Sequence, residues 1–209
     1  MPEARRGSLI AFEGPEGSGK STQVARAAQV LRADGHAIVQ STFEPGGTPL
    51  GRELREVLLH GRAALDPLAE LFLYLADRAQ HVAEVIAPAL DNGALVLTDR
   101  YSASTIAYQG YGRGLDLDAV GRADCWARGG LSPRLTILLD CPPRVGLARA
   151  VRTDRFHAEL EAFHARVRGG FLAQAAAAPA TWRVIDATQP IDAVHAMVMD
   201  AIRETLREP

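Results

Sequence analysis

One stretch, Glu13 to Thr22, constrains this chain more than any other. Its Gly14, Gly19, Lys20 and Ser21 fit the pattern G-x-x-x-x-G-K-S/T, with an apolar run before it and a helical pattern after it, as that motif requires. The glycines let consecutive backbone N–H groups point at one anion, and the N-terminus of the following helix adds partial positive charge. The stretch therefore predicts a phosphate cradle for a nucleoside triphosphate.

The residues of this cradle have separate expected tasks. Lys20 is expected to reach the β- and γ-phosphates, and the Ser21 hydroxyl is expected to bind Mg²⁺. A glycine-rich turn that only caps a helix is the alternative, and the flanking strand and helix count against it. The residues expected to bind the ATP donor are Gly14, Pro15, Glu16, Gly17, Ser18, Gly19, Lys20, Ser21 and Thr22.

Length and composition favour a single cytoplasmic domain, residues 1–209. With 209 residues and 47% hydrophobic content, the chain can bury one full core, and two domains would be cramped. A net charge of −2 gives no basic field that would attract nucleic acid. Cys125 and Cys141 lack metal-ligand spacing and are expected to be buried free thiols in a reducing compartment. No apolar run reaches the ~18 residues of a membrane helix, and residues 1–7 are too short and polar for a signal peptide.

Strand-like and helical patterns alternate along the chain, which is typical of an α/β fold with a parallel sheet. Strands are expected at about 9–12, 37–43, 94–98, 135–140 and 182–186, with helices between them. The expected fold is a P-loop NTPase-like, five-stranded parallel sheet flanked by helices. The apolar positions expected to face the core of three of the helices are Leu68, Leu71, Phe72, Leu75, Ala79, Val82 and Ile86; Phe156, Leu160, Phe163 and Val167; and Ile191, Val194, Val198, Ile202 and Leu206.

Polar residues follow two of the expected strands, at the carboxyl edge where an open parallel sheet binds ligands. Residues 43–48 hold a proline and two glycines, which predict either a ligand-edge loop or a plain connecting turn. Asp99 closes an apolar strand, and an unpaired carboxylate there is costly unless something binds it. We expect Asp99 to hold the Mg²⁺ shell directly or through water, and Arg100 to sit beside the transferred phosphate.

Three further segments carry side chains suited to nucleotides. Tyr74 and Arg78 are four apart in the long helix expected at 66–91, where they either stack on a base and grip a phosphate or form a solvated flank. Residues 102–114 are polar and punctuated by glycine, which predicts a recognition loop after a short helical turn. Three arginines, Arg149, Arg152 and Arg155, form either a solvated face or a short helical lid at about 149–160. The lid is favoured because Gly17 and Ser18 carry no positive charge. Phosphoryl transfer generally uses more positive charge to stabilise its transition state than Lys20 and Mg²⁺ supply.

Taken in order, these motifs make the chain similar to the thymidylate kinase family, P-loop enzymes that phosphorylate dTMP to dTDP with ATP. The resemblance covers nearly the whole chain, and apart from the P-loop it rests on the order and spacing of the motifs. These are FEGPEGSGKST at 12–22, FEPGGT at 43–48, the helix of Tyr74 and Arg78, DRY at 99–101, AYQG at 107–110, DRF at 154–156, VRGGFL at 167–172 and DAT at 186–188.

The resemblance implies a role for each matched residue. Glu16 would face the sugar 3′-hydroxyl, Tyr74 would stack on thymine, and Tyr108 would help to reject a ribose 2′-hydroxyl. The residues that would contact dTMP are Glu16, Glu44, Tyr74, Arg78, Arg100, Ser104, Thr105, Tyr108 and Gln109. Arg149, which would pack on adenine, and Ala187 join the ATP-binding residues. The catalytic set would be Lys20, Asp99, Arg100, Arg152 and Arg155, with Ser21 and Asp99 at the metal. Such enzymes usually form homodimers.

The chain also departs from the family pattern. Phe43 stands where most relatives have arginine, and His157 replaces the usual acidic residue after the DRF motif. Gly17 stands where one branch of the family has a P-loop arginine, so the chain resembles the bacterial branch whose catalytic arginine comes from the lid. These departures concern which lid arginine is catalytic and leave the nucleotide site intact.

The expected reaction is direct in-line transfer of the γ-phosphoryl group of ATP to a phosphate oxygen of dTMP. A deoxynucleoside kinase, whose neutral hydroxyl acceptor needs a carboxylate base such as Glu13 or Glu44, is one alternative, and another nucleoside monophosphate kinase is a second. A P-loop switch or motor ATPase is a third, disfavoured because the chain lacks extra surface segments for a protein partner.

Overall fold

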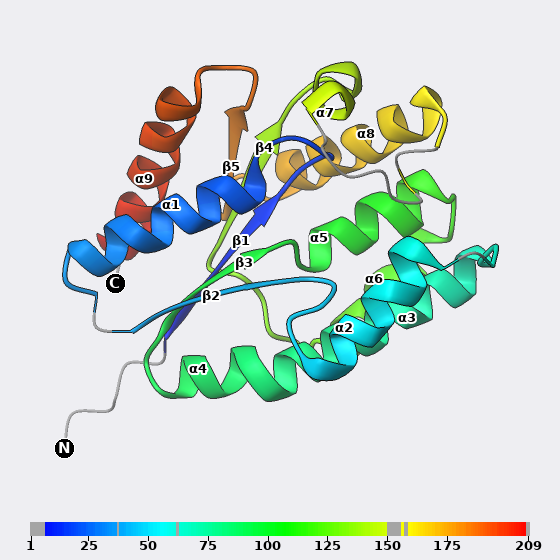
Figure 1. The fold of residues 1–209 in the computed structure, drawn as a ribbon, viewed down its shortest axis with the longest axis horizontal. Helices are drawn as coiled ribbons and strands as arrows, with labels where there is room; N and C mark the ends of the chain where they lie inside the picture. The colour runs from blue at the N-terminus through cyan, green and yellow to red at the C-terminus, as the bar shows by residue number, and fades with distance from the viewer. Residues whose placement is uncertain (1–6, 37, 62, 150–155, 157–158, 208–209) are drawn as a thin grey trace.

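The computed structural model describes residues 7–36, 38–61, 63–149, 156 and 159–207. A five-stranded, all-parallel sheet lies at its centre, in the order β2-β3-β1-β4-β5 (Figure 1). This confirms the α/β fold and the number of strands expected from the sequence. The strands are β1 (Ser8–Glu13), β2 (Val39–Phe43), β3 (Leu95–Asp99), β4 (Leu135–Asp140) and β5 (Trp182–Asp186).

Helices cover both faces of the sheet. Helices α1 and α9 pack together on one face, while α4 and α8 pack on the other (Figure 1). The α-helices are α1 (Lys20–Ala33), α2 (Pro49–Arg55), α3 (Pro67–His81), α4 (Ala87–Asp91), α5 (Ser102–Thr105), α6 (Leu117–Ala127), α7 (Pro143–Arg149), α8 (Glu161–Ala177) and α9 (Ile191–Arg207). Three π-helical segments adjoin them: η1 (Glu56–His60), η2 (Val82–Ile86) and η3 (Ile106–Gly112).

The central strand β1 shows why this sequence forms a covered sheet. Successive side chains of a strand point to opposite faces, so a strand buried on both faces is apolar throughout. Ile10 and Phe12 join the core under α1 and α9. Leu9 and Ala11 join the core under α4. All four are buried, which fixes the strand that precedes the P-loop between two cores.

Helices α2, α3 and α6 begin where the sequence offers a side-chain cap. Thr48, Asp66 and Asp116 accept hydrogen bonds from backbone N–H groups in the first turns of α2, α3 and α6. A proline follows the cap in α2 and α3, where its missing N–H has no intrahelical partner to lose.

The recognition loop expected after a short helical turn at 102–114 is instead helical, as α5 and η3. Gly112 of this segment allows close packing, whereas Gly114, just after η3, has a φ of 79° and no close neighbour. A Cβ at Gly112 would lie 2.7 Å from Phe163, and one at Gly170 of α8 would lie 2.7 Å from Tyr111. The helical segments η3 and α8 therefore approach more closely than a side chain at either glycine would permit. The polar, glycine-containing sequence of residues 102–114 does not by itself indicate this contact.

Several residues expected in the core are exposed. Leu68 and Phe72 of α3 are 49% and 58% exposed, because only part of the expected stripe, Leu71 and Leu75, packs against α6 and η3. Leu160, at 79%, precedes the first residue of α8, and Ile191 is the first residue of α9. Cys125 is exposed on α6, whereas Cys141 is buried as expected, and neither is in a disulfide. Among the described residues, none of the helices combines the length and apolarity that crossing a bilayer demands.

Candidate functional site

A cavity of about 1280 Å³ lies at the carboxyl edge of the sheet. It exceeds the roughly 300–1,000 Å³ that is common for one small ligand. The ends of β2 and β3 and the loops that follow β1 and β5 line it, as expected at the carboxyl edge of parallel strands. The predicted site residues that line it are Glu16, Gly17, Ser18, Gly19, Lys20, Ser21, Thr22, Glu44, Tyr74, Arg78, Asp99, Arg100, Ser104, Thr105, Tyr108, Gln109, Arg149 and Ala187.

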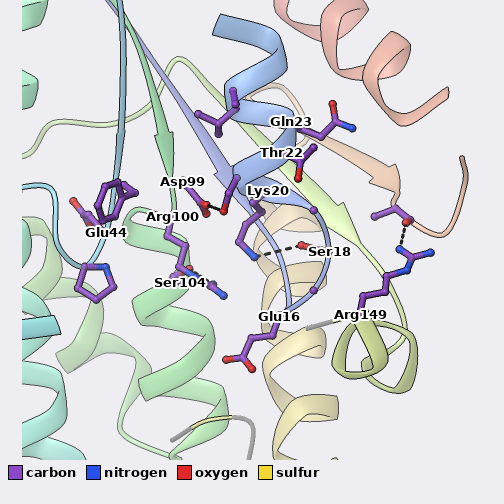
Figure 2. A pocket seen from close by; sticks show the side chains of 18 of the residues that line it. Glu16, Ser18, Lys20, Thr22, Gln23, Glu44, Asp99, Arg100, Ser104 and Arg149 are labelled. Carbon is purple, nitrogen blue, oxygen red and sulfur yellow. Dashed lines mark hydrogen bonds between the residues drawn. The ribbon is translucent and has the colours of Figure 1, made fainter. Parts of the chain in front are cut away.

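The loop between β1 and α1 wraps around the ammonium group of Lys20 (Figure 2). Lys20 Nζ donates to the carbonyls of Gly14 at 3.0 Å and Pro15 at 2.8 Å, and to Ser18 Oγ at 3.3 Å. Gly14 and Pro15 do not line the cavity themselves and act through these carbonyls. Burial, and then the nearby Arg100, lower the pKa of Lys20 to about 8.

The P-loop leaves no room for a side chain at Gly17. Its φ is 66°, and a Cβ there would lie 1.9 Å from the carbonyl oxygen of Gly146 in α7. An arginine at this position is incompatible with this packing of the loop against α7. Any further cation must therefore come from another element.

The hydroxyl of Ser21 and the carboxylate of Asp99 meet beside the P-loop. Ser21, in the first turn of α1, donates a short hydrogen bond to Asp99 Oδ2 at the end of β3. Among the described residues, no group of three or more His, Cys, Asp or Glu side chains could hold a metal ion. A metal here would be held by this hydroxyl and carboxylate together with phosphate oxygens and water, which is the ligand set typical of Mg²⁺.

Arg100 joins the P-loop to the opposite wall of the cavity. Its NH1 donates to Gly14 O at 3.2 Å and to Ser104 Oγ at 2.9 Å, and its NH2 donates to Tyr108 Oη at 3.2 Å. Burial alone would lower its pKa, but interactions with Tyr108, Asp99 and Glu13 outweigh burial and raise it. Its φ of 73° is unusual for a residue with a side chain, as is often found where function fixes the backbone.

An aromatic wall faces the P-loop across the cavity. Tyr108 of η3 meets Phe156 edge-on, with ring centroids 5.2 Å apart, and Tyr74 of α3 lies 6.5 Å from Phe156. These rings offer apolar faces of the kind on which a base stacks. Thr105 and Gln109 add polar atoms to the same wall, so the structure brings together the residues predicted to bind the acceptor.

Arg78 lies in an ion network rather than on a solvated flank. It is 2% exposed and donates from Nε to Glu44 Oε2 at 2.9 Å, from NH1 to Thr105 Oγ1 at 2.7 Å and Asp124 Oδ1 at 2.5 Å, and from NH2 to Tyr101 O at 2.9 Å. NH2 also lies 2.8 Å from Glu44 Oε2 in an ion pair, so each of its three nitrogens already has a protein acceptor. A contact with the acceptor nucleotide, which stays a prediction, would have to replace one of these bonds.

Glu13 and Glu44, the two candidate bases of the alternative kinase, are both engaged by the protein. Glu13 is fully buried and accepts from Tyr101 N at 2.9 Å, Ser104 N at 3.1 Å and Ser104 Oγ at 2.6 Å. Burial raises its pKa to about 7 despite these bonds. Glu44 accepts from Arg78 and bonds His81 Nδ1 at 2.8 Å.

The opposite end of the cavity is formed by α7 and the loop after β5. Arg149 NH1 donates to Ala187 O at 2.7 Å, which brings the two residues expected near adenine together (Figure 2). Arg152, Arg155 and most of the expected lid at 149–160 lie outside the described residues, so their roles stay predictions.

One cationic lining residue was missed by the sequence reasoning. Arg55, at the end of α2, lines the cavity, donates to Pro45 O at 2.7 Å and lies 5.8 Å from the ring of Phe43. The position of α2 directly after the ligand-edge loop at 43–48 is the signal that could have found it.

Comparison with known proteins gives one consistent result. A family model described as thymidylate kinase matches residues 12–198. The thymidylate kinase of Nitratidesulfovibrio vulgaris strain Miyazaki F is 53% identical over 212 residues, covering 96% of this chain and 98% of the relative. That of Geobacter sulfurreducens is 50% identical, covering 94% and 96%. The crystal structure of thymidylate kinase from Ehrlichia chaffeensis matches with a TM-score of 0.78 at 32% identity, covering 95% of this chain and 99% of that one.

Proposed function

The chain belongs to the thymidylate kinase family, so its reaction is transfer of a phosphoryl group from ATP to dTMP, and we propose that the cavity described above carries it out. The observation that supports this site most strongly is Arg100. Its guanidinium bonds both the P-loop and Ser104 and Tyr108 of the facing wall. Donor and acceptor phosphates bound on these two sides would meet at one fixed cation.

The proposed chemistry needs little from a base. The acceptor is a phosphomonoester whose second pKa is about 6, so it is ionised near neutral pH. Catalysis then consists of bringing two anions into line and neutralising their charge. Lys20 and Arg100 supply two cations between the P-loop and the wall that carries Ser104 and Tyr108. Arg152 and Arg155 are proposed to add a further cation on the strength of the family resemblance.

Ser21 and Asp99 are proposed to hold Mg²⁺. Their hydroxyl and carboxylate oxygens already meet at one point beside the P-loop, and both are ligand types that Mg²⁺ prefers. When bound, the ion would neutralise charge on the phosphates of ATP. Asp99 would keep it at the donor side of Arg100.

We expect Asp99→Asn to raise the Mg²⁺ concentration for half-maximal turnover by about tenfold or more. Asparagine keeps the size of the side chain and can still accept from Ser21, but it removes the negative charge. Turnover would be measured across a Mg²⁺ titration at saturating ATP. Asp200→Asn, at an exposed carboxylate of α9 that does not line the cavity, is the matched control and should leave the titration unchanged. An unaltered Mg²⁺ requirement in Asp99→Asn would exclude Asp99 from the metal site.

We expect Glu13→Gln to keep thymidylate kinase turnover within a few-fold. Its amide oxygen can accept from Tyr101 N and Ser104 N, and its NH₂ can donate to Ser104 Oγ. Because the pKa of Glu13 rises from 4.5 unfolded to about 7 folded, the folded state binds more protons between these values. Stability therefore falls as pH rises through this window, by on the order of 3 kcal/mol.

Glu13→Gln should remove that loss, which denaturant unfolding at about pH 5 and about pH 8 would measure. A folded Glu13→Gln protein that has lost activity by about 100-fold or more would instead support Glu13 as the base of a nucleoside kinase.

Acceptor choice tests the proposed function as a whole. ADP release is measured by a coupled assay at fixed MgATP with dTMP, dUMP, dCMP, dGMP and thymidine. Rapid turnover is expected with dTMP and little with thymidine. Preference for thymidine would overturn the proposal in favour of a deoxynucleoside kinase, and equal turnover without any acceptor would indicate an ATPase.

Two further properties are proposed for the whole protein. The neighbouring helices α3 and α6 carry the exposed apolar side chains Leu68, Phe72 and Trp126, the last 89% exposed. This surface supports a homodimer, which light scattering in dilute solution would detect. Two thiols outside any disulfide support a reducing compartment, the cytoplasm.

A further inference from the structure

Gln109 presents one end of its amide to a buried carboxylate. It lies on η3, is 1% exposed, and lines the cavity beside Tyr108. Its Nε2 donates to Oε1 of Glu70 on α3 at 2.9 Å. Glu70 is also 1% exposed, so this bond joins two buried side chains from helices that lie 39 residues apart in sequence.

Arg113 holds Glu70 in place. Its Nε donates to Glu70 Oε1 at 3.1 Å and its NH2 donates to Oε2 at 3.0 Å, a two-point contact that fixes the plane of the carboxylate. Its remaining nitrogen, NH1, donates to Glu159 Oε1 at 2.5 Å. The guanidinium also lies 4.8 Å from the ring of Phe163 and 5.4 Å from that of Phe156. Glu70 is therefore held from one side while it accepts from Gln109 on the other.

This arrangement decides which way the Gln109 amide points. Both oxygens of the Glu70 carboxylate accept hydrogen bonds from Arg113, so a neighbouring amide bonds this carboxylate through its NH₂ end. The carbonyl oxygen, Oε1, is then turned away from Glu70. Within the part of the chain that the structure describes, no donor to this oxygen is found. An acceptor atom is thus left available at the wall of the cavity.

We propose that Glu70, held by Arg113, is a positioning residue that makes Gln109 present a hydrogen-bond acceptor to the base of the phosphoryl acceptor. Such a wall favours a pyrimidine whose ring nitrogen carries a hydrogen, as in thymine or uracil. It disfavours cytosine, whose corresponding ring nitrogen is itself an acceptor. The inference rests on the proposed function, because it assigns the origin of base selection within that same site.

The test compares Glu70→Gln with Glu159→Gln, because both variants remove the charge of a carboxylate that accepts from Arg113. In Glu70→Gln the residue at 70 can donate as well as accept, so the Gln109 amide can flip and present NH₂ to the base. We expect kcat/KM for dTMP to fall about tenfold or more, mainly through KM, and the dTMP-to-dCMP ratio of kcat/KM to fall by at least about tenfold. Glu159→Gln loses the same charge beside Arg113 and leaves the Glu70 to Gln109 bond intact. It should keep the wild-type ratio, whatever it does to turnover.

A swap of the two side chains gives a stricter readout than loss alone. In Glu70→Gln with Gln109→Glu, residue 70 donates and residue 109 again offers an acceptor to the base. The dTMP-to-dCMP ratio should return to within a few-fold of the wild-type value. If Glu70→Gln is too unstable to assay, Arg113→Lys, which keeps the charge and loses the two-point contact, should lower the ratio in the same direction.

The outcomes separate this inference from the proposed function. An unchanged ratio in Glu70→Gln, an equal fall in Glu159→Gln, or a swap that fails to recover selectivity would each overturn the positioning role. If the wild-type enzyme itself does not phosphorylate dTMP, the proposed function fails before selectivity is measured. The KM for ATP, measured in every variant, should not change, because Gln109 lies on the wall opposite the P-loop.

Discussion

Replacing Lys20 with Met is expected to lower turnover about 10³-fold, with a folded protein. The ammonium group is buried in the P-loop, 7% exposed, and is held by two carbonyls and the Ser18 hydroxyl. Methionine has similar length but no charge, so the negative charge that builds up during transfer loses the cation that the P-loop supplies. Turnover with dTMP and the KM for ATP would be measured together, and the larger part of the loss is expected in kcat.

Arg32→Met is the matched control for this prediction. Arg32 lies in the last turn of the same helix, α1, and donates to Val39 O rather than to the P-loop. Removing its charge should leave turnover within a few-fold. Wild-type turnover in Lys20→Met would show that the phosphates are held elsewhere.

Lys20 is also the only lysine in the sequence, which allows a chemical test on the wild-type protein. Because burial lowers the pKa of Lys20 to about 8, a larger share of its amine is unprotonated near neutral pH than in an ordinary lysine. An amine-directed reagent should modify Lys20 and the chain terminus only. MgATP should protect Lys20 and activity in parallel.

Replacing Arg78 with Met is expected to destabilise the protein by roughly 3–5 kcal/mol. Arg78 bridges Glu44 and Asp124, and all three side chains are almost fully buried. Burial alone would lower the pKa of Arg78, but the two carboxylates outweigh burial and raise it. Without the guanidinium, two buried carboxylates lose their common partner. Denaturant unfolding would measure the loss.

Arg128→Met is the matched control. Arg128 also donates to Asp124, at 3.0 Å, but its side chain is 18% exposed and so nearer to water. A loss of about 1 kcal/mol or less is expected. If Arg78→Met instead keeps wild-type stability and changes only the KM for dTMP, Arg78 is a substrate ligand without a structural role.

The contrast between these two residues shows what sequence can reveal about such a site. The hydrogen-bond partners of Lys20 lie within six residues of it in the sequence, so the P-loop motif predicts both the loop and the position of the Lys20 side chain. Asp99 was found in the same way, because it closes an apolar strand. Arg78 was also singled out, yet its partners come from the loop after β2, from α5 and from α6, and no local pattern links those segments.

Close packing was equally hidden from the sequence. The glycines of residues 102–114 favoured a loop, whereas the structure uses Gly112 and Gly170 to bring η3 and α8 together. The expected apolar stripe at 68–86 was right for Leu71 and Ile86 and wrong for Phe72, which the fold leaves exposed. The spacing of apolar residues identifies an apolar face of a helix, but it does not indicate whether another element of the same chain packs against that face.

In the proposed reaction, the P-loop and the wall that carries Tyr108 bring two phosphates together at Arg100. Incubation with MgATP labelled at the γ-phosphate and unlabelled dTMP, followed by separation of the nucleotides, tests it directly. We expect the label to appear in dTDP, one label for each ADP formed, and little of it to reach inorganic phosphate. Label recovered as inorganic phosphate at a rate that dTMP does not alter would contradict it.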